Sequence, residues 1–241
     1  MKGAPVDIVH GTLAAERFRI PTPKPATPRA VVKAVHRIVE HFEWKGAVGC
    51  TIPGRVKHGT VLTAANIDRR WIGANAARLI EEKTGCRTFV LNDADAAGVA
   101  EMAFGAGRDR HDFVMVLTIG TGIGSALFIN QILVPNTELG HLELDGRDAE
   151  SHAADSARKR DDLPWKAWAR RFQRYLEHVE FLFAPDLLII GGGISRPKKW
   201  EKFSGHLKTQ ADLTPALLQN EAGIIGAAYS ARACYEPEVT V

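Results

Sequence analysis

Hydrophobic residues in the first half of the chain alternate between two spacings. Short apolar runs closed by proline, glycine or polar residues are typical of buried strands. Between these runs, apolar side chains recur every three or four positions, as in amphipathic helices. The predicted elements are a hairpin at 3–9 and 13–20, strands at 47–54 and 88–92, and helices at 28–45, 71–83 and 93–104. Strand and helix in alternation indicate an α/β fold.

The second half of the chain continues this alternation and adds a hairpin. The predicted elements are a strand at 112–119, a hairpin at 125–129 and 131–134, a helix that starts at Pro164, a strand at 186–193 and a helix at 222–231. The hairpin turns at Asn130 and Gln131, between two apolar runs. It matters for function because it follows a glycine-rich loop directly.

Composition narrows the class of protein. The chain has 241 residues, 45% of them hydrophobic, which is enough for one large or two modest cores. The net charge of +3 favours an anionic substrate but is too small for a nucleic-acid-binding surface. Three cysteines without a CxxC pair indicate neither a disulfide framework nor a zinc knot. With no signal peptide or membrane-length run, we expect a cytoplasmic protein that binds neither nucleic acid nor membrane.

The glycine-rich loop lies in the stretch "LTIGTGIGSALF" and contains Gly120, Thr121 and Gly122. A dinucleotide fingerprint requires a helix after the glycines, whereas here a strand follows. The loop therefore joins two paired strands. Its amides and the Thr121 hydroxyl suit phosphate binding, and a plain glycine-rich hairpin is the alternative.

A second glycine run and a basic cluster follow the last predicted strand. Gly192 and Gly193 lie at its carboxyl end, where open α/β sheets place their ligands. Arg196, Lys198 and Lys199 come next and suit an extended polyanion. A solvated basic face is the alternative for these cations, and also for the cluster at 158–160.

Two polar residues stand where a strand meets a helix. Asn92 and Asp93 both suit an N-cap, which would explain one of them. A carboxylate at the start of a helix also stays ionised and can take a proton from a hydroxyl group. Asp95 points about 200° around the helix from Asp93, so we expect it to face solvent or to support the site from behind.

A turn-rich segment after the hairpin contains Glu138, His141, Glu143 and Glu150. Metal binding, recognition of sugar hydroxyls and a solvated acidic loop are all open interpretations. No cysteine accompanies His141, which argues against a structural zinc site. Asn66 lies in another strand-to-helix connection, where a turn or cap role is expected.

Four motifs in order, "LNDADAAG", "LTIGTGIGSALF", "ELGH" and "LLIIGGGIS", resemble the ROK family of sugar kinases and its polyphosphate-using branch. The resemblance runs from about Lys2 to Ala233. It implies an α/β, two-lobe, actin-like (ribonuclease-H-like) fold. The implied smaller, sugar-binding lobe is 1–108 with 223–241, and the larger phosphoryl-donor lobe is 109–222.

The resemblance also implies roles for individual residues. Asp93 matches the general base on the 6-hydroxyl of glucose. The matching sugar contacts are Asn66, Asn92, Glu138, His141 and Glu150, and the matching phosphate contacts are Gly120, Thr121, Gly122, Gly192 and Gly193. The donor is then inorganic polyphosphate or ATP with Mg²⁺, with Arg196, Lys198 and Lys199 along the polyphosphate track. The resemblance further implies a homodimer, and the missing cysteines imply no zinc.

The start of the chain departs from the family pattern. Relatives begin with a strand and an Asp-x-Gly-Gly-Thr phosphate loop ahead of the residues seen here as "KGAPVD". We therefore expect a first lobe that lacks its N-terminal strand, and a chain that is weakly active or inactive as written. A non-catalytic sugar-binding remnant and a sugar-responsive regulator of the same family are the alternative functions.

Overall fold

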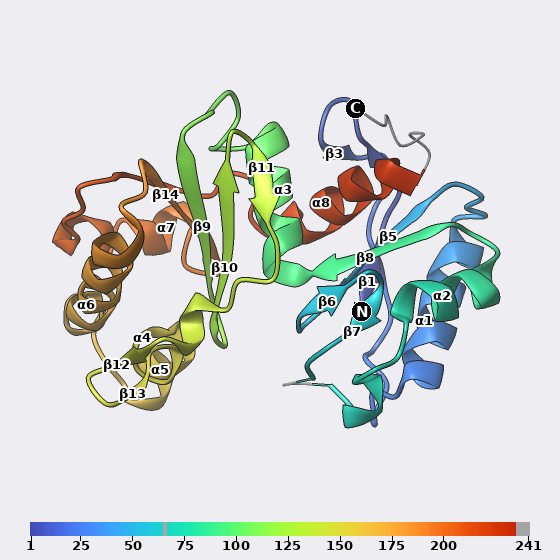
Figure 1. Ribbon diagram of the computed structural model, residues 1–241, viewed down its shortest axis with the longest axis horizontal. Coiled ribbons are helices and arrows are strands. Elements are labelled where there is room, and N and C mark those ends of the chain that lie inside the picture. The colour runs from blue at the N-terminus through green and yellow to red at the C-terminus, as the bar shows by residue number, and fades with distance from the viewer. Residues whose placement is uncertain (65–66, 235–241) are drawn as a thin grey trace. The chain divides into compact units, whose positions relative to one another are not determined.

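The computed structural model describes residues 1–64 and 67–234, which form two compact units (Figure 1). Unit 1 is Met1–Ala100 with Glu221–Val241, and unit 2 is Glu101–Asn220. The chain passes from one unit to the other inside a helix, whereas the lobe boundary expected from the sequence falls at residue 108. The assignment of a sugar-binding and a phosphoryl-donor lobe stays a prediction.

Unit 1 contains paired short strands, one parallel strand pair and four helices among its described residues. The strands are β1 (Lys2–Gly3), β2 (Val6–Asp7), β3 (Thr12–Leu13), β4 (Phe18–Arg19), β5 (Val48–Ile52), β6 (Val56–Lys57), β7 (Thr60–Val61) and β8 (Thr88–Asn92). The helices are α1 (Pro28–His41), α2 (Ala76–Thr84), the first part of α3 (Asp93–Phe104) and α8 (Ala222–Ala231), with 3-10 turns at Arg69–Trp71 and Arg232–Cys234. The expected N-terminal hairpin is confirmed, because β1 pairs with β4 and β2 with β3.

The parallel pair β5–β8 organises unit 1, with Ile52 opposite Asn92 at its carboxyl end. α1 begins where expected, because the Thr27 hydroxyl caps it by accepting the Ala30 amide at 3.2 Å. α1 and α2 lie side by side next to this pair (Figure 1). Their apolar faces bury Val35, Ile80 and other side chains together with strand residues such as Val90.

α8 packs closely against β5 and α3, as its small residues allow. A β-carbon added to Gly226 would lie 1.7 Å from the Ala96 carbonyl oxygen, so only glycine fits there. Leu91, Ala96 and Ala227 form a small core at this contact. The position of the strand β8 and of the helix that follows it is therefore fixed from behind.

Unit 2 contains one five-stranded sheet and a separate pair of short strands. Its strands are β9 (Phe113–Ile119), β10 (Ile123–Ile129), β11 (Ile132–Val134), β12 (Glu143–Leu144), β13 (Arg147–Asp148), β14 (Leu187–Gly192) and β15 (Asp212–Pro215). Its helices are the end of α3, α4 (Glu150–Ala153), α5 (Asp155–Arg160), α6 (Trp165–Phe183) and α7 (Pro197–Trp200), with 3-10 turns at Leu139–His141 and Ser204–His206. β12 and β13 form a separate small hairpin.

The order of the strands in this sheet is β11-β10-β9-β14-β15. β9, β10 and β11 form an antiparallel meander, and the expected turn is confirmed by φ values of 51° and 64° at Asn130 and Gln131. β14 runs parallel to β9, with Gly192 opposite Ile119. The two glycine loops therefore follow neighbouring parallel strands at the same end of the sheet.

The long helix α6 covers one face of this sheet (Figure 1). Trp168, Phe172 and Tyr175 are fully buried and pack with strand residues such as Leu117 and Leu188. Burial of side chains this large supplies about 1.5–3 kcal/mol each. The sheet that carries the glycine loops is thus rigidly supported.

One sequence expectation in unit 1 was wrong, and another is narrowed to one of its two alternatives. The helix expected at 71–83 begins only at Ala76, because Gly73 adopts a φ of +83° and Asn75 caps the helix by accepting the Arg78 amide at 2.9 Å. Asp95 does not face solvent, since its side chain is 1% exposed. The other alternative for Asp95, that it supports the site from behind, is compatible with this burial and stays a prediction.

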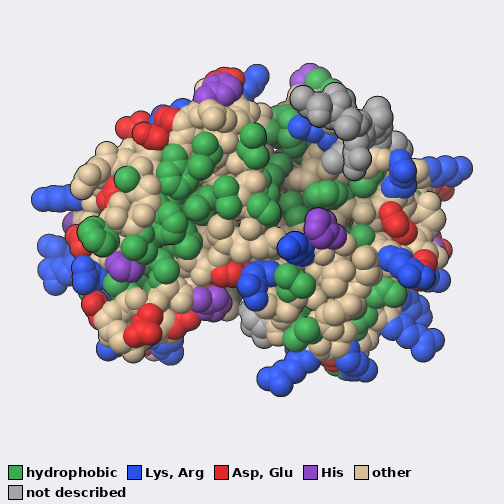
Figure 2. Space-filling model, in the orientation of Figure 1, with side chains coloured by type: hydrophobic (Ala, Val, Ile, Leu, Met, Phe, Trp, Pro, Cys, Tyr) green, Lys and Arg blue, Asp and Glu red, His purple; other side chains and the backbone are tan. Residues whose placement is uncertain are grey.

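Apolar side chains are also visible on part of the surface of unit 2. Figure 2 shows hydrophobic atoms gathered over β9, β10 and β11, where Ile129, Ile132 and Val134 are exposed. Among the helices of the described residues, none combines the length and the hydrophobicity needed to cross a bilayer.

Candidate functional site

Asn92 and Asp93 have different roles at the carboxyl end of β8. The Asn92 side-chain oxygen accepts the amides of Ala94 at 2.7 Å and of Asp95 at 3.3 Å, so Asn92 caps α3. Its amide group donates to the Gly54 carbonyl at 3.1 Å, which ties the cap to the loop after β5. The cap is therefore Asn92, and Asp93 is not needed for it.

The Asp93 carboxylate is exposed and stands at the first residue of α3. One of its oxygens accepts the Ala94 amide at 3.0 Å. Although the side chain can be reached from solvent, loss of hydration raises the pKa of the carboxyl group, and backbone hydrogen bonds oppose that rise. A raised pKa makes the ionised form a stronger base for a hydroxyl proton.

Asn66, the remaining sugar contact expected in unit 1, lies outside the described residues. Its role is therefore left as the resemblance implies it.

In unit 2, the loop Gly120–Gly122 closes a tight turn between β9 and β10, in which the Gly120 amide donates to the Gly122 carbonyl at 2.9 Å. Glu150 lies directly behind this loop. Its carboxylate accepts the Ile123 amide at 2.9 Å, and a β-carbon on Gly122 would lie 2.2 Å from the same oxygen. Glycine is required at 122 because of this close approach. The loop and the first residue of α4 are thus in direct contact.

His141 is held by Asp148 across the β12–β13 hairpin region. Its Nδ1 lies 2.7 Å from an oxygen of Asp148, and both side chains are partly exposed. The hydrogen bond to Asp148 raises the pKa of His141, the negative charges of Glu150 and Glu138 add to the rise, and partial burial opposes it. His141 therefore keeps its proton to a higher pH than a free histidine, with Nε2 left as a donor.

Sequence reasoning missed Ser125, which positions the segment that carries Glu138 and His141. Ser125 is fully buried, its hydroxyl bonds to the Thr137 carbonyl at 3.0 Å, and it accepts the Leu139 amide at 3.1 Å. No motif marks this serine in the sequence, because its partners Thr137 and Leu139 lie in a different segment. His141, Asp148 and Glu150 then have ligand-type atoms within 4.8 Å of one another.

The second glycine loop follows β14, beside the first. Gly192 has a φ of +81°, and a β-carbon there would lie 2.4 Å from the Ile119 carbonyl. The buried Ser195 closes the turn through its amide and hydroxyl, which donate to the Gly192 carbonyl at 3.2 and 3.0 Å. Gly193 has open space around it, and the Lys199 Nζ lies 4.0 Å from where its β-carbon would be.

The two basic clusters differ in their partners. Arg158 and Lys159 pair with the buried carboxylate of Asp155 at 2.8 and 2.7 Å, so they stabilise α5. Within the described part of the chain, no acidic side chain forms an ion pair with Arg196, Lys198 or Lys199. The second cluster is therefore the one with charge to offer an anion.

The cluster of His141, Asp148 and Glu150 does not fit Mg²⁺. That ion prefers an all-oxygen octahedral set with several waters. Here one ligand is an imidazole, the Asp148 carboxylate is hydrogen-bonded to it, and Glu150 holds the Ile123 amide. No residue is assigned to Mg²⁺, and the absence of a zinc site stays a prediction.

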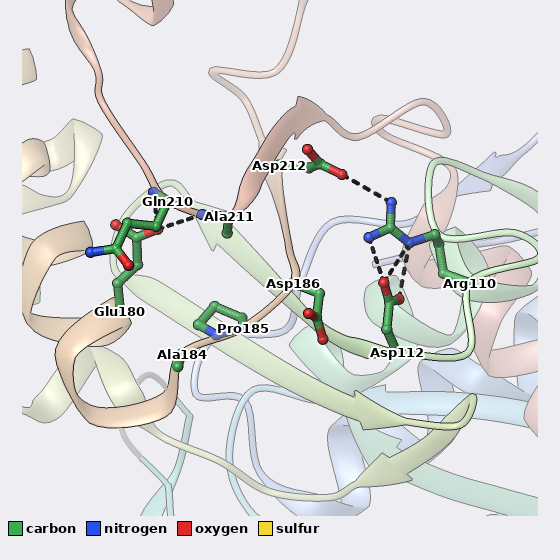
Figure 3. A pocket seen from close by; sticks show the side chains of 9 residues that line it. All are labelled: Arg110, Asp112, Glu180, Ala184, Pro185, Asp186, Gln210, Ala211 and Asp212. Atoms are coloured by element: carbon green, nitrogen blue, oxygen red, sulfur yellow. Dashed lines mark hydrogen bonds and ion pairs between the residues drawn. The ribbon is translucent and has the colours of Figure 1, made fainter.

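A cavity of about 340 Å³ lies at the opposite end of the same strands (Figure 3). Its polar groups are bonded to one another. Arg110 bridges Asp112 at 2.6 Å and Asp212 at 3.2 Å, as Figure 3 shows, while Asp186 accepts the Phe113 amide at 2.9 Å. Glu180 accepts two further amides of the cavity wall. The cavity is acidic, and its charged side chains are already hydrogen-bonded within the protein. We therefore do not assign the candidate site to it.

Comparisons with known proteins identify the family to which the chain belongs. Residues 6–157 match the ROK family, and the chain belongs to that family. The resemblance predicted from the four motifs is thereby confirmed.

Three relatives are informative. The chain is 48% identical to a polyphosphate glucokinase of Mycobacterium tuberculosis, over 95% of this chain and 86% of that protein. It is similar to the crystal structure of the inorganic polyphosphate/ATP-glucomannokinase of Arthrobacter sp. strain KM, with 46% identity, a TM-score of 0.90 and coverage of 97% and 94%. It is also similar to the crystal structure of a ROK family glucokinase of Streptomyces griseus in complex with glucose and AMPPNP. The identity is 26%, the TM-score is 0.78, and the match covers 95% of this chain and 94% of that one. The α/β fold of a ROK sugar kinase is confirmed.

Proposed function

We propose that this chain is a glucose kinase, which transfers the terminal phosphoryl group of inorganic polyphosphate, or of ATP, to the 6-hydroxyl of glucose. The observation that carries the proposal is the division of tasks between Asn92, which caps α3, and Asp93, which is left for a substrate. The names of the polyphosphate and glucose kinases to which the chain is similar support both substrates.

Asp93 acts as the general base in this proposal. The hydroxyl oxygen of the sugar attacks the terminal phosphorus, the bridging P–O bond breaks toward the shortened polyphosphate or ADP, and the hydroxyl proton goes to the Asp93 carboxylate. The raised pKa of Asp93 favours this transfer. Little other covalent chemistry is required, so alignment and charge stabilisation supply most of the rate.

The donor is held by the two glycine loops of unit 2. They follow the neighbouring strands β9 and β14, which places their amides at one edge of the sheet. Mg²⁺ bound with the donor phosphates would screen their charge during transfer. Arg196, Lys198 and Lys199, which form no ion pair with the described residues, provide positive charge beside the second loop for a longer polyanion.

The polar residues to which the resemblance assigns the recognition of glucose are Glu138, His141 and Glu150 in unit 2, and Asn92 and Asn66 in unit 1. When His141 is protonated, its Nδ1 donates to Asp148 and its Nε2 is free to donate to the sugar. Glu150 contacts the sugar through the oxygen that the Ile123 amide does not use. A homodimer and a cytoplasmic location remain predictions, the first testable by gel filtration.

The test is the formation of glucose 6-phosphate by the purified chain with glucose, Mg²⁺ and either donor. Replacing Asp93→Asn should lower kcat by about 10²–10⁴-fold, the usual contribution of a general base. Asp109→Asn is the matched control, since Asp109 is an exposed aspartate whose φ of +65° asparagine tolerates. Glucose binding without transfer from either donor would overturn the proposal in favour of the non-catalytic, sugar-binding alternative. An Asp93→Asn rate within threefold of the unmodified chain would overturn the role of Asp93.

A further inference from the structure

All three carbonyl groups of the first glycine loop are occupied from within the protein. The Gly120 carbonyl accepts the Ser156 amide at 3.0 Å, and the Thr121 carbonyl accepts the Ser156 hydroxyl at 2.5 Å. The Gly122 carbonyl accepts the Gly120 amide at 2.9 Å. Two of these three bonds therefore come from one residue, Ser156.

The donors of the same loop are left open. The Ile123 amide is taken by Glu150. Within residues 1–64 and 67–234, no protein acceptor takes the amides of Thr121 or Gly122, and the Thr121 side chain is exposed. The loop thus offers N–H and O–H groups to a ligand while its carbonyl oxygens point elsewhere. An anion gains from such an array and would be repelled by a carbonyl oxygen turned toward it.

Ser156 is itself firmly held. It lies in the first turn of α5, next to Asp155, whose buried carboxylate is paired with Arg158 and Lys159. The carbonyls of Ala153 and Ala154, just before it, both lie within hydrogen-bond distance of the buried Trp168 indole N–H, at 2.9 and 3.3 Å. The backbone on which Ser156 lies is therefore anchored by contacts that do not involve the glycine loop.

We propose that Ser156 is a positioning residue for the phosphoryl donor. Its hydroxyl holds the Thr121 carbonyl turned inward, so that the loop presents only hydrogen-bond donors to phosphate oxygens. The proposal rests on the proposed function, because it assumes that this loop binds the donor. It assigns no contact between Ser156 and any substrate.

The test compares Ser156→Ala with the unmodified chain. We expect the KM for polyphosphate and for ATP to rise about tenfold, the order of loss for one hydrogen bond that orients a charged ligand's site. The KM for glucose should change less than twofold. Calorimetric titration with tripolyphosphate, which needs no turnover, should show the same weakening of donor binding.

Three further variants make the result specific. Ser156→Thr keeps the hydroxyl and should restore donor binding, and Ser156→Cys keeps the size with a weaker donor and should fall between. Thr209→Ala is the control, because the Thr209 hydroxyl also donates to a carbonyl, that of Ala211 at 2.9 Å, at the other end of the sheet. It should leave donor binding unchanged.

The proposal on Ser156 is overturned if the Ala and Cys variants bind tripolyphosphate as tightly as the unmodified chain. It is also overturned if donor and glucose affinities fall together, since that indicates a general structural defect. Failure of the proposed function looks different, because then the unmodified chain forms no glucose 6-phosphate at all.

Discussion

The two ends of the central sheet of unit 2 differ in how their polar groups are used. At the amino ends of β9, β14 and β15, Arg110 bonds to Asp112 and Asp212 beside the cavity of Figure 3. At the carboxyl end, the Thr121 and Gly122 amides are left open by the described protein, while the loop carbonyls are all engaged.

This difference shows that the presence of a cavity does not by itself identify a binding site. A cavity whose polar groups are already hydrogen-bonded within the protein has little to gain from a ligand, whereas open amides at the end of parallel strands gain one new bond each. Function should therefore respond strongly to changes at the carboxyl end and weakly to changes at the amino end.

The largest effect is expected for Gly122→Ala. The added β-carbon would collide with the Glu150 carboxylate, so either the loop or Glu150 must move. A displacement of about 1 Å in a positioning element costs roughly 100-fold in kcat/KM. Steady-state kinetics with each donor measure the loss. Gly205→Ala is the matched control, since no atom lies within 4 Å of its β-carbon position, and equal behaviour of the two variants would refute the role of the loop.

An intermediate effect is expected when Arg196, Lys198 and Lys199 are replaced together by Ala. Arg196 and Lys198 are exposed and Lys199 is partly exposed. Cations at such positions contribute about 0.2–1 kcal/mol each, so the KM for long polyphosphate should rise on the order of tenfold. ATP, which is shorter, should be affected less. Equal losses with the two donors would argue against a polyphosphate track.

A smaller and pH-dependent effect is expected for Asp148→Asn. The variant keeps an oxygen that can accept from His141 but removes the charge, so the pKa of His141 should fall. His141 of the variant then loses its proton at a lower pH, so its glucose KM should begin to rise at a lower pH than that of the unmodified chain. Near neutrality the two KM values should differ roughly threefold. NMR titration of the His141 ring measures the pKa directly, and an unchanged titration would contradict the expected coupling.

The smallest effect is expected at the amino end. Arg110→Ala breaks the contacts to Asp112 and Asp212, yet it should change kcat and both KM values by less than about twofold, because surface ion pairs contribute little. Kinetic assays measure this. A large loss of donor affinity would show that the cavity participates in function.

The sequence predicted much of the fold because its local signals agree with the tertiary structure. The cap at Thr27, the turn at Asn130 and Gln131, and the apolar period of α6 each specify an element without help from distant residues. The start of α2 was misplaced because Trp71 belongs to the buried core but lies in a separate 3-10 turn.

The site could be predicted only in part. Sequence reasoning left open which of Asn92 and Asp93 caps α3, because both residue types do so, and only the hydrogen bonds decide between them. Ser125 and Ser156 were missed, since a serine that holds a loop carries no motif of its own. Their roles depend on strands and helices that are distant in sequence.

The most direct test of the donor site follows backbone amide resonances while tripolyphosphate is added to the ¹⁵N-labelled chain. We predict that the amides of Thr121 and Gly122 shift first and furthest, because they are the open donors of the loop. The amides around Arg110 and Asp212 should stay in place. Shifts at the amino-end cavity without shifts at Thr121 and Gly122 would contradict the assignment of the donor site to the glycine loop.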